Sequence, residues 1–339
     1  MNILVIRLSS MGDVILTTPV LSWLMRRYPS ATLYMLTDSR YVSLFDNDPR
    51  VKQVIGIDKH GDNAQQLNSL AAVSWDKIID LQNSTKSAAL RRAIGSTAPT
   101  GLFNKKHFQR FLLLYLRINC YDTSDTVVQR YLLAAGDNSS GNEYLTPEIY
   151  CNKEDTALLV NRFLPNRNTK PVLALMPFSA WKNKEWPREY FAEVGRAFAV
   201  QGWQVLVLGG PEDTEHADEL ARTIGNNTVS VAGRISLYEC GCLLVACSLA
   251  LGNDTGLSHL ARACGVTTGM VFGATTRHFG FFPQGEPRFC VFEEKVCCRP
   301  CHPHGGNVCL RGGRICLSRI RPDAVITGLQ AVYNGEQGK

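Results

Sequence analysis

The strongest constraint on the fold is the alternation of short apolar runs with segments of helical periodicity. Ile3–Ile6 is an unbroken apolar run of strand length, and such a run in an α/β protein indicates a strand buried on both faces. Over Val14–Tyr28 the apolar positions follow helical spacing, and Arg26 and Arg27 favour a helix C-terminus. Asp13 therefore stands between the first strand and the first helix, where open α/β sheets bind ligands. A plain helix cap is the alternative interpretation of this carboxylate.

The same alternation continues in two halves, and Asp137–Glu148, rich in Gly, Ser, Asn and Pro, marks a linker between them. Each half predicts a parallel sheet with right-handed crossovers. We expect a Rossmann-like domain over 1–150, a second over 151–320 with a cysteine-rich tail, and a closing helix over 321–339. The expected strands are Ile3–Ile6, Thr32–Leu36, Val54–Ile57, Lys77–Leu81, Thr97–Leu102, Val172–Met176, Trp203–Leu208, Val229–Val231, Leu249–Gly252 and Thr267–Phe272. The expected later helices are Thr126–Ala135, Pro187–Phe198, Asp213–Ile224, Leu237–Val245, Gly256–Cys264 and Pro322–Tyr333.

The composition fits a globular enzyme of two domains. The chain has 339 residues, of which 45% are hydrophobic and 19% charged, which argues against disorder. Arg7 and Asp13 interrupt the apolar start, which is atypical of a signal peptide. The most apolar long segment, near Leu243–Leu251, is too short to span a membrane. We predict a cytoplasmic protein whose twelve cysteines stay reduced or bind metal.

A basic stretch interrupts the first half. Between Lys86 and Arg117 there are seven Lys or Arg residues and no acidic residue, in a chain of formal net charge +6. A solvated surface is one interpretation. The other is a binding patch for an anionic partner, such as a phosphorylated glycan, an anionic lipid surface or nucleic acid.

The second half carries loops suited to a phosphate-containing ligand. In Gly252–His259 a strand ends and a helix begins, and a helix N-terminus favours an anion such as a diphosphate. An ordinary cap followed by a core histidine is the alternative. Ser179–Pro187 follows another strand and carries Lys184, which can neutralise phosphate as a point charge. Leu208–Asp213 also ends a strand, and its carboxylates can accept hydrogen bonds from a ribose.

Four segments together resemble the ADP-heptose:lipopolysaccharide heptosyltransferases of glycosyltransferase family 9. They occur in the family's order over nearly the whole chain, and they are Ile3–Pro19, Asp80–Ser87, Lys184–Pro187 and Asp254–His259. The resemblance implies a GT-B fold, in which two doubly wound Rossmann-like domains face each other across a cleft. It also implies that the N-terminal domain binds the acceptor and the C-terminal domain binds the nucleotide sugar.

The resemblance assigns roles to individual positions. Asp13 matches the general base, and the acceptor side is expected to include Ser10, Lys86 and Arg91. The diphosphate of the donor is expected to contact Ser179, Lys184, Thr255 and Gly256. Asp213 is expected to face the ribose and Ile235 the adenine, with Asp254 and His259 near the donor sugar or its phosphates.

The implied activity is inverting, metal-independent transfer of heptose from ADP-L-glycero-D-manno-heptose to the inner core of lipopolysaccharide, without a cofactor. The phosphorylated acceptor would be met at the inner membrane's cytoplasmic face, where the basic stretch and Phe108–Leu116 are expected to contact the acceptor or lipid headgroups. One alternative is a family 9 transferase with another nucleotide sugar or glycan acceptor. Others are a non-catalytic nucleotide-sugar sensor and a zinc-containing nucleic-acid-binding protein.

The cysteines near the C-terminus suggest a structural metal site. Cys298 and Cys301 have the spacing of a zinc-binding pair, and Cys309 and Cys316 follow at wider spacing. The four thiolates could bind one zinc ion with no role in catalysis. Reduced or partly disulfide-bonded cysteines are the alternative interpretation.

Overall fold

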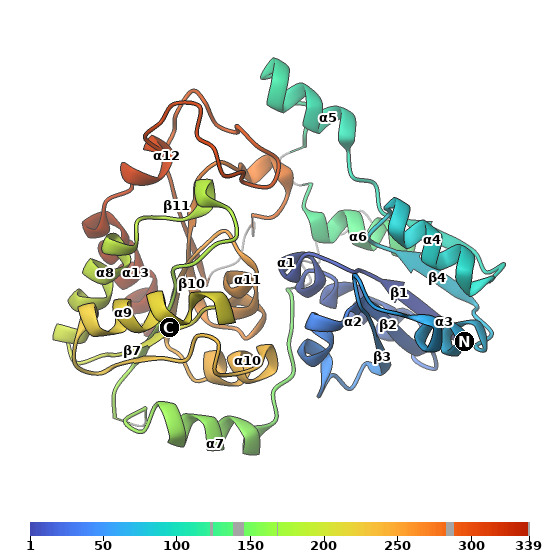
Figure 1. Ribbon diagram of the computed structural model, residues 1–339, viewed down its shortest axis with the longest axis horizontal. Coiled ribbons are helices and arrows are strands. Elements are labelled where there is room, and N and C mark those ends of the chain that lie inside the picture. Colours follow the sequence, from blue (N-terminus) through green and yellow to red (C-terminus); the bar gives the residue numbers. More distant parts are fainter. Residues whose placement is uncertain (123–124, 138–145, 168, 283–287, 338–339) are drawn as a thin grey trace. The chain divides into compact units, whose positions relative to one another are not determined.

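A computed structural model describes residues 1–122, 125–137, 146–167, 169–282 and 288–337. The chain forms two units, drawn in Figure 1. Unit 1 comprises Met1–Lys106 and Asp125–Tyr150, and unit 2 comprises His107–Ser124 and Cys151–Lys339. Most of the predicted linker, residues 138–145, lies outside the described residues.

Unit 1 is built on a five-stranded parallel sheet of order β3-β2-β1-β4-β5. Its strands are β1 (Asn2–Ile6), β2 (Thr32–Asp38), β3 (Val51–Ile57), β4 (Lys77–Asp80) and β5 (Thr100–Leu102). Its helices are α1 (Met11–Ile15), α2 (Thr18–Arg27), the 3-10 helix η1 (Ser39–Phe45), α3 (Ala64–Ala71), α4 (Thr85–Ile94) and α6 (Val127–Ala135). The chain winds outward from β1 in one direction and then returns to β4 on the other side. The switch point, where such sheets bind ligands, therefore lies between β1 and β4.

The helix predicted over Val14–Tyr28 is in fact two helices. The first helix begins at Met11 and ends at Ile15, and the second begins at Thr18. Pro19 has no N–H to donate to the carbonyl of Ile15, and that carbonyl instead accepts the Thr18 hydroxyl at 2.8 Å. The early start places Asp13 in the first turn of α1, with Ser10 as its N-cap.

Unit 2 is built on a six-stranded parallel sheet of order β11-β10-β9-β6-β7-β8. Its strands are β6 (Val172–Met176), β7 (Gln204–Val207), β8 (Thr228–Ser230), β9 (Leu249–Asn253), β10 (Thr267–Phe272) and β11 (Phe289–Glu293). Its main helices are α7 (Lys153–Phe163), α8 (Arg188–Val200), α9 (Thr214–Ile224), α10 (Leu237–Val245), α11 (Gly256–Ala263) and α13 (Pro322–Gln337). Its shorter helical turns are α5 (His107–Phe111), η2 (Leu112–Leu116), η3 (Lys182–Lys184), η4 (Pro211–Asp213), η5 (Arg277–Phe279) and α12 (Ile315–Ser318). Here the switch point lies between β6 and β9.

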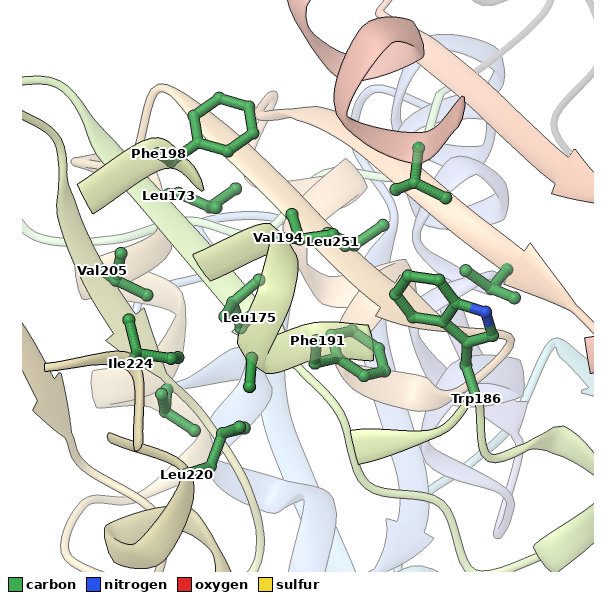
Figure 2. Close-up of a cluster of buried hydrophobic side chains, with 14 of the residues drawn as sticks. Leu173, Leu175, Trp186, Phe191, Val194, Phe198, Val205, Leu220, Ile224 and Leu251 are labelled. Carbon is green, nitrogen blue, oxygen red and sulfur yellow. The ribbon is translucent and has the colours of Figure 1, made fainter. Parts of the chain in front are cut away.

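The core of unit 2 fixes the loop that follows β6. Figure 2 shows aromatic and aliphatic side chains of α8 and α9 packed on the strands β6 and β9. Trp186 ends that loop inside this core with no exposed surface, and its Nε1–H donates to the carbonyl of Ile320 at 3.0 Å. Burial of so large a ring contributes on the order of 2–3 kcal/mol, so the loop is held firmly at its C-terminal end.

The predicted fold class is confirmed, since both sheets are parallel and flanked by helices. The elements that were not predicted include α3, β11, which pairs with β10, and α7, which is capped by the Asn152 side chain. The segment 107–124, which the sequence placed in the N-terminal domain, groups with unit 2 instead. Helix α13, expected to close the chain, also belongs to unit 2 and buries Val325 and Leu329 in its core.

Candidate active site

Asp13 lies at the carboxyl end of β1, held by hydrogen bonds on both carboxylate oxygens. Oδ1 lies 2.7 Å from Nη2 of Arg7 and accepts the Tyr131 hydroxyl at 3.4 Å. Oδ2 accepts the backbone N–H of Ser10 at 3.0 Å and the Ser10 hydroxyl at 2.7 Å. The Asp13 side chain remains 14% exposed, and the Arg7 side chain 7%. The carboxylate is thus shielded without being sealed from solvent.

These contacts keep Asp13 ionised. Burial alone would raise the pKa of Asp13, but the Arg7 guanidinium and the Ser10 hydrogen bonds outweigh it and hold the pKa below its ordinary value. Arg7 is itself fixed, because a guanidinium N–H donates to the Leu81 carbonyl and the group lies 5.5 Å from the centre of the Tyr131 ring. At neutral pH the site therefore presents a charged proton acceptor.

The loop after β4 completes the unit 1 site. Gln82 Oε1 accepts the backbone N–H groups of Leu8 and Ser9 at 3.1 and 3.2 Å, which ties this loop to the one after β1. Asp80 is fully buried, and its Oδ2 lies 3.0 Å from Arg91 Nε. The structure thus places Arg91, a predicted acceptor contact, in an ion pair with a buried carboxylate, whereas Lys86 is exposed on the first turn of α4.

In unit 2 the loops after β6 and β9 meet in a buried ion pair. Lys184 Nζ lies 2.7 Å from Asp254 Oδ2 and also donates to the Asp254 carbonyl at 3.0 Å. Oδ2 accepts the Thr275 hydroxyl at 2.8 Å, and His259 Nε2 lies 4.0 Å from Oδ1. Burial would raise the pKa of Asp254, but Lys184 and His259 lower it below the ordinary value. The carboxylate is therefore ionised and neutralised by its cationic partner.

Close backbone packing positions this ion pair. The carbonyl of Asn183 accepts the backbone N–H of Ala274 at 3.1 Å, and a Cβ on Gly273 would lie 2.4 Å from that same carbonyl oxygen. Only glycine allows the loop after β10 to approach the Lys184 turn so closely. The side-chain oxygen of the buried Asn253 accepts the backbone N–H of Trp186 at 2.9 Å, and its amide nitrogen donates to the Pro177 carbonyl at 2.7 Å. These two bonds join the loops after β6 and β9.

The N-terminus of α11 carries an unsatisfied polar group. Thr255 is the N-cap residue, yet among the residues that the structure describes its side chain makes no cap hydrogen bond and its buried hydroxyl has no hydrogen-bond partner. A buried hydroxyl without a partner costs about 1–3 kcal/mol, and a ligand or an ordered water that bonds to it removes this cost. Gly256 follows in the first turn of this eight-residue helix, and His259 lies buried one turn on.

The other predicted donor contacts lie on separate loops of unit 2. Ser179, half-buried after β6, accepts the Trp181 N–H at 3.2 Å. Asp213, after β7, accepts the Gly210 N–H at 2.9 Å, and burial raises its pKa. Ile235 is half-buried in the loop between β8 and α10. The loops after β6, β7, β8 and β9, which carry these residues, all follow the carboxyl ends of strands in one parallel sheet.

The structure does not form the predicted zinc site. Within the described parts of the chain, no three His, Cys, Asp or Glu side chains are arranged to hold a metal ion. All twelve cysteines are free thiols, including Cys298, Cys301, Cys309 and Cys316. Burial raises the pKa of Cys301 and Cys316, and the nearby thiols of Cys298 and Cys309 contribute to the increase.

Comparison with known proteins decides the family. The model of glycosyltransferase family 9 (heptosyltransferase) matches residues 64–302, more than half of the chain. The chain belongs to glycosyltransferase family 9. This confirms the resemblance and the predicted glycosyltransferase activity, and it favours them over a nucleic-acid-binding protein.

Curated relatives of this family 9 enzyme extend over most of its length. Lipopolysaccharide heptosyltransferase 1 of Pseudomonas aeruginosa is 25% identical, covering 98% of both chains. Lipopolysaccharide heptosyltransferase 2 of Escherichia coli is 24% identical, over 82% of this chain and 84% of the relative.

Solved structures confirm the fold. E. coli ADP-heptose lipopolysaccharide heptosyltransferase II matches with a TM-score of 0.78 at 22% identity, over 99% of this chain and 100% of that one. A family 9 glycosyltransferase from Veillonella parvula matches with a TM-score of 0.79 at 21% identity, over 98% of this chain and 97% of that one. The predicted GT-B class is therefore the fold of this family 9 member.

Four residues of the site were not predicted from the sequence. Arg7 and Tyr131 contact Asp13, Thr275 contacts Asp254, and Arg262 Nη1 lies 3.1 Å from His259 Nδ1. Arg7 could have been predicted, because it directly follows a fully apolar strand, and a buried cation needs an ionic or hydrogen-bonding partner. Tyr131 could not have been predicted, since its helical segment is apolar on several sides and no pattern distinguishes Tyr131 from its neighbours.

Proposed function

We propose that this family 9 enzyme transfers heptose from ADP-heptose to the inner core of lipopolysaccharide with inversion of configuration. Its relatives named above are lipopolysaccharide heptosyltransferases, and one of the similar structures is that of E. coli ADP-heptose lipopolysaccharide heptosyltransferase II. The observation that carries the proposal is the unsatisfied Thr255 hydroxyl at the N-terminus of α11, beside the Lys184–Asp254 ion pair.

These groups suit the diphosphate of the donor. Two of the three N–H groups of Lys184 donate to Asp254, so the third can donate to a phosphate oxygen. The Thr255 hydroxyl and the first N–H groups of α11 can bind a second oxygen, with the helix dipole favouring the negative charge. Because negative charge grows on the diphosphate as the sugar leaves, the same groups stabilise the transition state. We propose that this chain needs no metal ion for that step.

The remaining donor contacts are assigned to residues on the loops that follow the strands of unit 2. Asp213 is proposed to accept hydrogen bonds from the ribose, and Ile235 to pack on the adenine. Ser179 and Gly256 are proposed to complete the phosphate site, while Asp254 and His259 face the sugar. Asp254 suits this role because Lys184 neutralises it, so that a nearby phosphate is not repelled.

Asp13 is proposed as the general base. It must take the proton of the acceptor hydroxyl as that oxygen attacks the anomeric carbon, a contribution of typically 10²–10⁴-fold. A carboxylate offers about four acceptor positions, and Arg7, Tyr131 and Ser10 occupy them. The Ser10 hydroxyl is the donor most easily exchanged, because it belongs to an exposed residue and rotates freely. We infer that the acceptor hydroxyl replaces it on Asp13 Oδ2, and we propose that Lys86, exposed on α4, meets acceptor phosphate.

The test is a transfer assay with a panel of nucleotide sugars and heptose-free inner-core acceptors, with the products identified by mass spectrometry. We expect ADP-heptose to give a product one heptose heavier, and Asp13→Asn to abolish its formation while ADP still binds. The matched control is Asp38→Asn, because Asp38 also ends a strand of unit 1 in an ion pair, 2.8 Å from Arg40 Nε. Transfer from a different nucleotide sugar, or full activity of Asp13→Asn, would overturn the proposal.

We further propose that the segment Phe108–Ile118 attaches the enzyme to the anionic surface of the inner membrane at its cytoplasmic face, where the acceptor lipid lies. Five large apolar side chains of this segment are at least half exposed, namely those of Phe108, Phe111, Tyr115, Leu116 and Ile118. Leu113 points inward and packs with Tyr121 and Phe279, so the segment has an anchored side and an outer apolar side. No helix in the described ranges is both long enough and apolar enough to cross a membrane.

Charge favours an anionic lipid surface as the partner. Arg110 and Arg117 lie within the segment, and Lys105 and Lys106 precede it in the sequence. A basic residue near an anionic membrane contributes about 1 kcal/mol, and burial of a large apolar side chain about 1.5–3 kcal/mol. Several such side chains together give reversible membrane binding.

Vesicle sedimentation tests this attachment. The protein is expected to pellet with vesicles containing phosphatidylglycerol, to pellet less at high salt, and to stay in solution with pure phosphatidylcholine. The double variant Phe108→Ser/Tyr115→Ser should lose most of the binding. Leu310→Ser is the matched control, because Leu310 is 95% exposed outside the segment. Equal binding of both variants would exclude the segment as the attachment site.

A further inference from the structure

The segment after β11 carries a buried arginine whose side chain reaches the loop after β10. The Arg299 side chain is only 9% exposed. Its Nε and Nη2 donate to the Thr275 carbonyl at 3.2 and 2.9 Å, and its Nη1 donates to the Glu294 carbonyl at 2.7 Å. Because β10 and β11 are neighbouring strands, the guanidinium joins the two loops that follow them.

Glu293, the last residue of β11, holds this guanidinium in place. Its Oε2 lies 3.0 Å from Arg299 Nη2, and its Oε1 pairs with Arg277, whose side chain is half exposed. Burial would raise the pKa of Glu293, but the two arginines lower it below its ordinary value. The carboxylate is therefore ionised, and it fixes Arg299 while leaving N–H groups of the guanidinium for the Thr275 carbonyl.

The loop after β10 is tied down on two sides. The Ala274 carbonyl accepts the backbone N–H of Cys301 at 3.1 Å, next to the bonds from Arg299 to Thr275. The Ala274 N–H donates to the Asn183 carbonyl, also at 3.1 Å. Thr275 is buried, so its carbonyl needs a partner within the protein. Arg299 supplies that partner, and the loop lies between the Lys184 turn and the segment after β11.

The same residue carries the hydroxyl that contacts the candidate donor site. The Thr275 hydroxyl donates to Asp254 Oδ2 at 2.8 Å, and that oxygen lies 2.7 Å from Lys184 Nζ. We propose that Arg299 is a positioning residue of the donor site: it fixes the Thr275 backbone so that the hydroxyl holds Asp254 against Lys184. This inference rests on the proposed function, because it assigns the ion pair to the site of the nucleotide diphosphate.

The effect of Arg299 on the donor is indirect. Without the guanidinium, the buried Thr275 carbonyl loses its side-chain donor and the loop is free to shift. The Thr275 hydroxyl then no longer restrains the Asp254 carboxylate, and the third N–H of Lys184 is no longer aimed at a phosphate oxygen. Asp13 belongs to unit 1 and is held by its own partners, so its protonation does not depend on Arg299.

A double-mutant cycle on ADP affinity tests the inference. Isothermal titration calorimetry is carried out at a temperature at which every variant is folded. Arg299→Gln and Thr275→Val should each weaken ADP binding about 5- to 10-fold, as for the loss of one hydrogen bond. The double variant should be weakened by about the same factor as either single variant, because both changes remove the same restraint on Asp254.

Two further variants separate positioning from a general loss of structure. Arg299→Lys keeps the charge beside Glu293 and one donor for the Thr275 carbonyl, so it should restore most of the ADP affinity that Arg299→Gln loses. Its cycle with Thr275→Val replaces the first one if Arg299→Gln does not fold. Arg277→Gln is the matched control, because it removes the half-exposed partner of the same carboxylate. It should change ADP affinity by less than about twofold.

The outcomes distinguish this inference from the proposed function. Multiplied effects in the double variant, equal losses in Arg277→Gln and Arg299→Gln, or unchanged ADP affinity in Arg299→Gln would each overturn the positioning role alone. A wild-type enzyme that binds no ADP would overturn the proposed function and this inference with it. The acidic limb of the pH profile of transfer should coincide in Arg299→Lys and wild type, and a shift of that limb would also contradict the inference.

Discussion

Arg7 and Asp13 form an ion pair of 2.7 Å at the carboxyl end of β1, and both side chains are largely buried. The guanidinium keeps the carboxylate ionised in surroundings whose burial would otherwise protonate it. Arg7 thereby sets the pH range over which Asp13 can accept a proton. The ion pair of Lys184 with Asp254 is its counterpart in unit 2, at the carboxyl ends of β6 and β9.

Arg7→Gln should shift the acidic limb of the pH profile of transfer to higher pH. A base must be deprotonated to act, so activity falls as the pH drops through its pKa, and loss of the cation raises the pKa of Asp13. The limb of kcat/KM reports this pKa in the free enzyme. Arg7→Lys keeps the charge and should shift it less. Superimposable profiles of wild type and Arg7→Gln would refute the role of Asp13 as base.

Lys184→Gln should weaken ADP binding by about 10- to 100-fold, which corresponds to one charge-assisted hydrogen bond of about 1.5–3 kcal/mol. Isothermal titration calorimetry measures the affinity. Lys182→Gln is the matched control, because Lys182 carries the same charge in the same turn but is exposed. If the two variants bind ADP equally, the diphosphate does not contact Lys184.

Thr255→Val should weaken ADP binding without lowering stability. The hydroxyl has no partner in the described part of the chain, so its replacement by a methyl group removes a buried, unsatisfied polar atom. We expect a Tm equal to or above that of the wild type, with ADP affinity reduced about 10-fold or more. Thr255→Ser retains the hydroxyl and should bind ADP nearly normally. A lower Tm with unchanged affinity would show a purely structural hydroxyl.

Gly273→Ala should disturb the Lys184 turn through the backbone. The added Cβ would lie 2.4 Å from the Asn183 carbonyl oxygen, so either the turn or the loop after β10 must move. We expect a destabilisation of about 1–3 kcal/mol and weaker ADP binding. Gly313→Ala is the control, since the nearest atom to its Cβ would lie 3.7 Å away. Thermal unfolding and ADP titration of both variants decide the matter.

Local patterns in the sequence determined where most strands and helices lie. The predicted bounds of Val172–Met176, Leu237–Val245 and Thr267–Phe272 coincide with β6, α10 and β10. Apolar periodicity and capping residues act over a few positions, so they can be read without knowing the rest of the fold. The same locality placed Asp13, Lys184 and Thr255 after strands, and hence at the carboxyl edges of their sheets.

Only the tertiary structure decided which partners these residues meet. Tyr131 reaches Asp13 from a distant helix, and Thr275 reaches Asp254 from the loop after β10. Arg91, expected to face the acceptor, forms an ion pair with the buried Asp80, which the sequence did not predict. Ionic and hydrogen-bonding partners depend on burial and on which strands lie side by side, and both arise from contacts between distant parts of the chain. The sequence by itself therefore determined the positions of the reactive groups, and the tertiary structure determined their charge states and their freedom to bind.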